Sequence, residues 1–322
     1  MLGLILLLQT LTVAVSGPPT SPEYLPLRVA NAEGYFAREG LAVTLRTTRA
    51  EVGAAEALTQ GQADLAATSL EALLRFGPRM EHQRPRLIFG LTAAPPVALL
   101  AGTTLGGTVR TIGDLVGLRV GVAAPGAPEH AWFSALLGRA GLRVTQVDLV
   151  SLGVRGLVSA VESGDVQAGL VQEPFATRLI GEGRATVLAD LRGPDAVRRA
   201  LGVSTVNVAV FVRADRQPRD RDLTAFARAV LAAEQLLATA SPDTLAARLP
   251  RNVVGAPDEF ERRLETTRGG YLPDGSVSAD QLRESIALIR AHTPLPATLH
   301  LPRAEDMLHT GPLRRARESA RD

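Results

Sequence analysis

Polar side chains gather in the loops that follow predicted strands, and their types suit ligand recognition better than covalent chemistry. These loops offer hydroxyls, backbone amides, one histidine, the only tryptophan and two glutamates. Because loops at the carboxyl ends of parallel strands meet at one edge of a sheet, we expect them to rim a single cleft. The candidate ligand-binding residues are Ser16, Thr20, Ser21, Ser69, Thr92, Gly126, Glu129, His130, Trp132, Glu173 and Asn207.

The segment from Pro125 to Trp132 carries more of these groups than any other loop. A glycine loop at a helix N-terminus presents unpaired N–H groups that can hold an anion, but a strand-to-helix turn needs the same residues whatever it binds. Glu129 in the first turn would complement the helix dipole. If Glu129 faces the cleft instead, it repels an anion and favours an amine or a heteroaromatic donor. Trp132 could wall the site or pack in the core.

Other candidates also have a structural interpretation. Ser69 is placed to cap the helix that begins at Glu71, and a cap at a cleft can also bind a ligand. Glu173, at the end of a predicted strand, could satisfy backbone donors. His130 could be a surface or structural histidine, and Asn207 is equally open.

Familiar catalytic patterns are missing from the chain. The sequence contains no G-x-S-x-G elbow, no H-E-x-x-H and no phosphate-loop pattern. Its five histidines are not spaced as a metal pair, and it has no cysteine for a disulfide or a thiolate site. We therefore expect no catalytic residues, no metal and no cofactor.

The composition is that of an ordinary folded protein with room for two modest cores. Hydrophobic residues make up 46% and charged residues 21% of the 322 residues. All 35 basic residues are arginine, they are interleaved with acids, and the net charge is only +2. Because aromatic residues account for just 4%, stacking platforms for single strands are not expected either. Nucleic acid is not an expected partner.

Two stretches of the chain repeat one local plan of helix, Gly-Leu turn, strand, helix, Gly-x-x turn and strand. Gly40 and Gly61 mark the turns of the first copy, and Gly141 and Gly164 those of the second. A glycine just past a helix end supplies the left-handed backbone that turns the chain into the next strand. Two similar α/β lobes with a ligand cleft between them follow from this repeat.

The alternation of strands and helices predicts that each lobe is a mostly parallel sheet flanked by helices. Strands are expected at Leu11–Val15, Val43–Thr47, Ala63–Ala67, Arg86–Leu91, Val97–Ala101, Leu118–Val122, Arg143–Val150, Val166–Val171 and Val206–Val212. Helices are expected at Leu27–Arg38, Val52–Gln60, Glu71–Phe76, Glu129–Arg139, Val154–Ser163, Leu223–Ala238, Pro242–Leu249, Glu259–Thr267 and Ala279–Ala291.

Two crossings should join the lobes, because no low-complexity linker divides the chain. The prolines at Ala93–Pro96 suit an extended first crossing. We expect residues 11–96 plus 208–322 to form lobe I and residues 97–207 to form lobe II. The late helices should pad lobe I. Residues 1–10 could be a truncated signal or an anchor, although no basic flank precedes the apolar run.

Several motifs occur here in the order found in one family. They are Leu27 to Val43 with its Gly34-Tyr-Phe-Ala-Arg-Glu-Gly-Leu-Ala-Val core, Gly61-Gln-Ala-Asp64, Asp114 to Val122, Gly164-Asp-Val-Gln-Ala168 and Glu173-Pro174. With them the chain resembles the substrate-binding proteins of ABC importers of the nitrate/sulfonate/taurine and thiamine-precursor (NMT1/THI5-like) type. The resemblance covers roughly residues 11 to 215.

This resemblance implies a type II, two-lobed periplasmic-binding-protein fold that closes on its ligand by hinge bending. It also implies a monomer outside the cytoplasmic membrane that captures a small organic solute and delivers it to an ABC permease and its ATPase. The loop at Pro125–His130 has no serine or threonine, which argues against a simple nitrate or sulfonate ligand.

Two alternatives stay open. One is an enzyme on the same fold, resembling pyrimidine synthases or menaquinone-pathway dehydratases, in which His130 would act with Glu129 or Glu173 as acid and base. The other is a sensory ligand-binding domain whose partner is a receptor.

Overall fold

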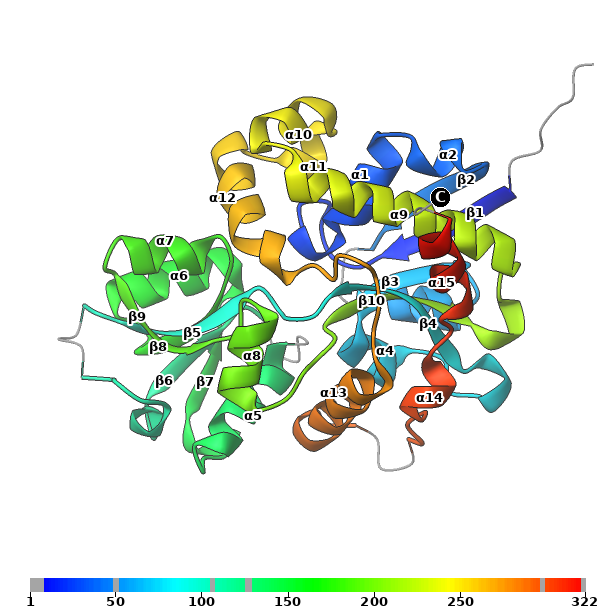
Figure 1. Cartoon of the computed structure of the whole chain (residues 1–322). Coiled ribbons are helices and arrows are strands. Elements are labelled where there is room, and N and C mark those ends of the chain that lie inside the picture. The colour runs from blue at the N-terminus through cyan, green and yellow to red at the C-terminus, as the bar shows by residue number, and fades with distance from the viewer. Residues whose placement is uncertain (1–8, 49–51, 105–107, 125–128, 296–298, 320–322) are drawn as a thin grey trace, which may run out of the picture.

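The computed structural model describes residues 9–48, 52–104, 108–124, 129–295 and 299–319. Most of the predicted signal or anchor at residues 1–10 lies outside these ranges, and so does Gly126. Figure 1 shows two lobes side by side, each built on one sheet with helices around it. The predicted α/β class with two flanked sheets is confirmed.

The first sheet has five strands in the order β2-β1-β3-β10-β4. They are β1 (Gln9–Val15), β2 (Leu41–Thr47), β3 (Leu65–Ser69), β4 (Pro85–Thr92) and β10 (Val208–Arg213). Strands β2 and β3 pair in parallel with β1, whereas β10 runs antiparallel between β3 and β4. All strands except β10 therefore point one way and bring their carboxyl ends to one edge.

The second sheet repeats this plan in the order β7-β6-β8-β5-β9. Its strands are β5 (Val97–Gly102), β6 (Arg119–Val122), β7 (Asp148–Ser151), β8 (Ala168–Gln172) and β9 (Ala185–Asp190). Here β5 is the reversed strand, antiparallel to both β8 and β9. Each sheet is thus mixed, with one reversed strand among four that run the same way.

Helices cover both faces of each sheet (Figure 1). Those of the first lobe are α1 (Leu25–Ala32), α2 (Tyr35–Arg38), α3 (Gly53–Thr59), α4 (Leu70–Phe76), α9 (Asp220–Thr239), α10 (Pro242–Arg248), α11 (Arg251–Val254), α12 (Pro257–Thr267), α13 (Ala279–His292), α14 (Ala304–Met307) and α15 (Gly311–Glu318). Those of the second lobe are α5 (Glu129–Arg139), α6 (Gly153–Ser163), α7 (Phe175–Gly181) and α8 (Pro194–Leu201). Short 3-10 helices are η1 (Pro22–Tyr24), η2 (Glu81–Gln83), η3 (Ile112–Leu115), η4 (Val144–Gln146), η5 (Ala214–Arg216) and η6 (Arg268–Gly270).

Alternate residues of the interior strand β1 pack into two separate cores. Val13 and Val15 pack with Phe226 of α9, while Ala14 faces the opposite side with Leu70 of α4. This is the period-two pattern of a strand buried on both faces.

The turn glycines of the repeated plan all adopt left-handed backbone. Gly40 and Gly141 have φ of 76°, Gly61 has 68° and Gly164 has 86°. Because the same turn recurs at matching places in the two lobes, the internal repeat read from the sequence is a repeat of structure.

Two predicted elements differ in the structure, and three elements of the structure were not predicted. The helix expected over Leu27–Arg38 is two helices, because Gly34 (φ 71°) breaks it between α1 and α2. The strand expected over Arg143–Val150 starts late, at β7: the backbone N–H of Arg143 donates to the side chain of Gln146 (2.8 Å) and closes the turn η4 first. The helices α7 and α8 and strand β9 were not predicted.

Helix α13 does more than pad the first lobe, contrary to expectation. It packs against α5 of the second lobe, and His292 Nδ1 lies 3.2 Å from Ser134 Oγ. The crossings between the sheets, residues 93–96 and 202–207, therefore run beside a helix that touches both lobes. The exact division into residues 11–96 plus 208–322 and 97–207 stays a prediction.

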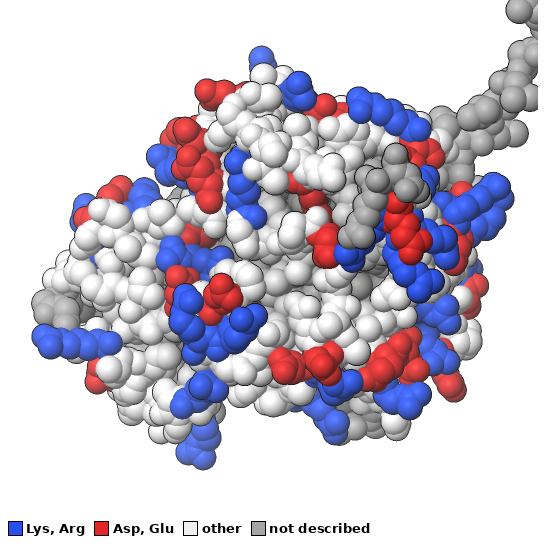
Figure 2. Space-filling view, viewed as in Figure 1, with Lys and Arg blue, Asp and Glu red and all other residues white. Residues whose placement is uncertain are grey.

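The face seen in Figure 2 carries acids and arginines side by side, without a broad patch of one sign. No helix in the described ranges has both the length and the apolar character needed to span a bilayer.

Candidate functional site

A cavity of about 440 Å³ lies between the two sheets, at the carboxyl ends of their parallel strands. The loop after β1 supplies Thr20, Ser21 and the helix η1, and the end of β3 supplies Ser69. The second lobe contributes the loop after β6 and the segment from Gln172 to Phe175 after β8. Both lobes therefore form its walls, which is the arrangement that a ligand-binding cleft between lobes requires.

Two carboxyl groups, one from each lobe, dominate the chemistry of this cleft. Glu129 begins α5, and its Oε1 accepts a hydrogen bond from Gln172 Nε2 (2.6 Å). Burial raises the pKa of Glu129, against the opposing effect of that bond. On the other wall, burial raises the pKa of Glu23 to about 7, and the charge of Glu129 adds to the rise. The two acids are close enough to repel each other across the cleft.

The remaining charges of the cleft are balanced locally. Both oxygens of Glu173 are engaged: Oε1 accepts from Arg192 Nη1 (2.8 Å) and Thr177 Oγ1 (2.8 Å), and Oε2 from the Thr177 N–H (3.2 Å). Burial lowers the pKa of Arg263 on α12, and the charge of its neighbour Glu259 partly offsets this effect. Within the described part of the chain, Glu23 and Glu129 are the two charged lining residues without a charged partner.

Seven of the predicted site residues line the cavity: Thr20, Ser21, Ser69, Glu129, Trp132, Glu173 and Asn207. Their contact with a ligand stays a prediction. For three of them the structural role is visible as well. Ser69 Oγ caps α4 by accepting from Ala72 N (3.1 Å), Trp132 packs in the core of the second lobe, and Glu173 holds Arg192.

Three other predicted residues are not part of the cavity wall. Ser16 is fully buried and donates its hydroxyl to Thr68 Oγ1 (2.9 Å). Thr92 is buried too, and its Oγ1 accepts a weak bond from Asn207 Nδ2 (3.4 Å) that links the two crossings. His130 lies on α5, where burial and the charge of Arg75 lower its pKa.

Several lining residues were not predicted. They include the acids Glu23 and Glu259, the aromatic residues Tyr24 and Phe175, Gln172 and Arg263. Glu23 and Tyr24 follow the proline-rich loop after β1 directly, so loop position alone could have suggested them. Arg263 could not have been found from its neighbours, because a helix in a distant part of the chain brings it to the cleft.

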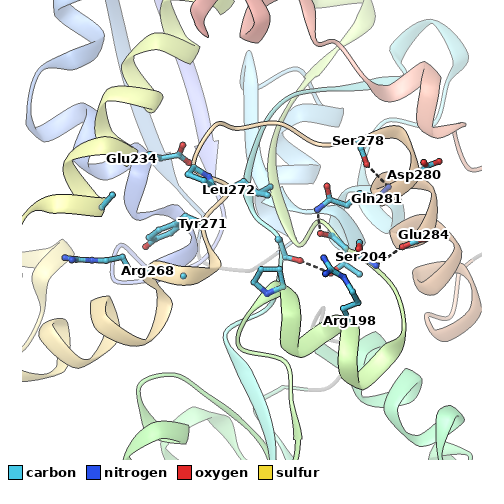
Figure 3. A pocket seen from close by; sticks show the side chains of 16 residues that line it. Arg198, Ser204, Glu234, Arg268, Tyr271, Leu272, Ser278, Asp280, Gln281 and Glu284 are labelled. Atoms are coloured by element: carbon cyan, nitrogen blue, oxygen red, sulfur yellow. Dashed lines mark hydrogen bonds between the residues drawn. The ribbon is translucent and has the colours of Figure 1, made fainter. Parts of the chain in front are cut away.

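A second and larger cavity, about 820 Å³, lies at the crossings themselves. In Figure 3, Glu234, Tyr271 and Arg268 lie on one side of it and Ser204, Gln281 and Glu284 on the other. Its floor is the second crossing, which α13 holds: Glu284 Oε2 accepts from Ser204 N (2.7 Å) and Ser285 Oγ accepts from Val206 N (2.9 Å). We regard the strand-end cleft as the candidate site, because among the described residues it is where the loops that follow the strands of both sheets converge.

No cluster of three or more potential metal-ligating side chains occurs in the ranges that the structure describes. The lining that the structure describes offers hydrogen-bonding groups, charges and aromatic surface.

Two mixed α/β lobes, joined by two crossings around a cleft at the strand ends, define the periplasmic-binding-protein fold. The chain belongs to the NMT1/THI5-like family, whose model matches residues 21–244. The family resemblance read from the sequence is thereby confirmed. A comparison with curated proteins found no match.

Solved structures share the fold over nearly the whole chain. A protein from Bordetella bronchiseptica RB50 is 22% identical with a TM-score of 0.76, covering 97% of this chain and 98% of its own. A putative periplasmic sulfonate-binding protein of a Methylobacillus flagellatus KT ABC transporter is 16% identical, with a TM-score of 0.73 and coverages of 98% and 95%. The periplasmic nitrate-binding protein NrtA from Synechocystis PCC 6803 is 12% identical, with a TM-score of 0.60 and coverages of 97% and 89%.

Proposed function

We propose that this protein is the solute-binding component of an ABC importer, which captures a small organic molecule in the cleft between its lobes. The observation that carries the proposal is the placement of one cavity at the carboxyl ends of both sheets, with two crossings beside it. A ligand that touches both walls stabilises the closed arrangement relative to the open one, and this difference in affinity drives closure.

Delivery to a permease needs a difference between the empty and loaded forms that the permease can read. Hinge closure supplies it, since it changes the outer surface of both lobes at once. The family and the named functions of the similar structures support this role. We place the protein outside the cytoplasmic membrane, as a monomer, with an ABC permease and its ATPase as partners.

Binding accounts for the cleft better than acid–base catalysis does. His130 is not among the described residues that line the cavity, and both oxygens of Glu173 are already hydrogen-bonded within the second lobe. These two observations support binding over the acid–base pairs that the enzyme alternative requires.

A solute screen by thermal unfolding tests the proposal. The panel would hold amines, heteroaromatic bases, amino acids, sulfonates and nitrate. A solute at a hundred times its Kd should stabilise the protein by about 2.7 kcal/mol, which gives a readily visible shift in Tm. Small-angle scattering should then show a more compact particle with that solute, at the mass of a monomer.

Variants on the two walls provide the control. Thr20→Ala on the first lobe and Gln172→Ala on the second should both weaken binding, because the ligand must contact both walls to close them. Thr239→Ala, at the exposed end of α9, should leave the affinity unchanged. A solute whose affinity depends on one wall only, with no change in scattering, would contradict capture by closure.

A further inference from the structure

The charges of the cleft are arranged for one class of solute. The structure describes five charged residues in its lining, and three of them have a partner close by. Glu173 pairs with Arg192 at 2.8 Å, and Glu259 and Arg263 lie one turn apart on α12. The guanidinium of Arg263 is also directed at the end of α11, where Nη2 donates to Val254 O (2.9 Å). Among the described lining residues, only Glu23 and Glu129 have no cation paired with them.

These two acids lie on opposite lobes, so the repulsion between them depends on how far the cleft is closed. Glu23 belongs to η1 of the first lobe and Glu129 to α5 of the second. Closing an empty cleft brings two carboxylates together in a partly dehydrated space, where like charges repel more strongly than in water. A positive group between them removes that repulsion and replaces it with two charge-assisted hydrogen bonds.

The cavity also supplies surface for an organic framework around such a charge. Tyr24, Trp132 and Phe175 line it together with the two acids. Aromatic faces attract cations through their quadrupole and cover the apolar part of a ligand at the same time. Gln172 holds one oxygen of Glu129 in place by its 2.6 Å bond, so this carboxylate is oriented before a ligand arrives.

We propose that the solute is an organic cation, a protonated amine or amidine on an apolar or aromatic framework, bound between Glu23 and Glu129. This assignment rests on the proposed function and names its substrate class. The positive group of the solute favours closure of the cleft, because it interacts with one carboxylate from each lobe.

Three probes of nearly equal shape test the class. Benzylamine carries a positive charge at neutral pH, benzyl alcohol none and phenylmethanesulfonate a negative one. In calorimetric and ligand-observed NMR titrations of the full chain, benzylamine should bind and the sulfonate should not, with the alcohol in between. Glu129→Gln should weaken benzylamine by about tenfold or more, because a hydrogen bond to a charge is lost. The same variant should leave the affinity for benzyl alcohol nearly unchanged.

The pH dependence gives an independent readout. The pKa of Glu23 is about 7, so this group gains a proton as the pH falls from 8 to 6, while benzylamine stays protonated. The affinity for benzylamine should therefore fall as the pH falls, and benzylamine binding near pH 7 should release protons. Glu71, whose pKa burial also raises to about 7, and His130 lie near the same acids and contribute to the titration, while Arg75 stands beside them as a fixed positive charge. Glu23→Gln therefore serves to isolate the share of Glu23.

The outcomes separate the two levels of the proposal. Preferred binding of the sulfonate, with compaction of the particle, would overturn the cation class and leave solute capture standing. The cation class would also be overturned if Glu23→Gln and Glu129→Gln both left the affinity for benzylamine unchanged, or if benzylamine did not bind at all. An exposed-site variant, Glu261→Gln on α12, is the matched control for loss of a negative charge and should have no effect.

Discussion

Glu234 on α9 is a carboxyl group that the fold buries without a partner. It is 4% exposed, and neither oxygen has a hydrogen-bond partner among the described residues. Burial, and secondarily the charge of Asp274, raises its pKa from 4.5 to about 9. The Glu234 carboxyl is thus neutral in the folded state over a pH range in which it is ionised in the unfolded chain.

This shift predicts a stability that declines with pH. The contribution of Glu234 to the free energy of unfolding is fully present below pH 4.5 and is lost progressively as the pH rises to about 9. In this pH range only the unfolded state gives up the proton. Relative to Glu234→Gln, the wild type should lose up to about 1.4 kcal/mol of unfolding free energy per pH unit in this range. Urea unfolding at pH 5 and pH 8 measures it. The exposed Glu261→Gln should show no such change, and an equal wild-type difference for Glu234→Gln at both pH values would contradict the prediction.

At the scale of single residues, the sequence could point to some of the site and not to the rest. Ser69 ends β3, Glu173 follows β8 directly, and Glu129 begins the helix after β6, so the order of elements alone places them at the cleft. The opposition of Glu23 and Glu129 could not be predicted, because it depends on how the lobes face each other. Glu234 did leave a signal: it interrupts the helical stripe of Leu223, Ala227, Val230 and Leu237, all buried.

At the scale of elements, the turn glycines can be tested one at a time. Gly141 has a φ of 76° and nothing within 4 Å of the position of an added Cβ, so Gly141→Ala adds backbone strain alone. We expect it to destabilise the protein by about 1–2 kcal/mol in chemical unfolding. Gly181 ends α7 with ordinary helical space around it, and Gly181→Ala should be neutral or stabilising by up to about 1 kcal/mol. Equal effects of the two variants would show that handedness does not matter at this turn.

Most elements could be predicted because their hydrophobic period and end signals agree. Helix α5 begins and ends at the predicted residues, and Ser69 caps α4 as expected. Strand β9 was missed because it is an edge strand with a largely solvated surface, which gives it no run of buried residues. Helix α8 did carry readable signals, a proline in its first turn and Gly202 beyond its end.

At the scale of the whole molecule, the lobe closure that we propose would involve more than the two crossings. Helix α13 holds the second crossing through Glu284 and Ser285, and it touches α5 of the second lobe through His292 and Ser134. A movement of the lobes must therefore slide α5 along α13. Such a contact favours rotation about one axis, in which each lobe moves as a rigid body.

Rigid-body closure can be measured directly because the chain has no cysteine of its own. Spin labels at Met80→Cys and Val116→Cys sit on exposed positions of the first and second lobes. The distance between them should change when the solute found in the screen binds. Labels at Val116→Cys and Val187→Cys both lie on the second lobe, and their distance should stay the same, since rotation leaves distances within a lobe intact. If both pairs changed, the ligand would be reshaping the second lobe itself. If neither changed while the solute bound, the cleft would be a static pocket, and the permease would have to read something other than lobe closure.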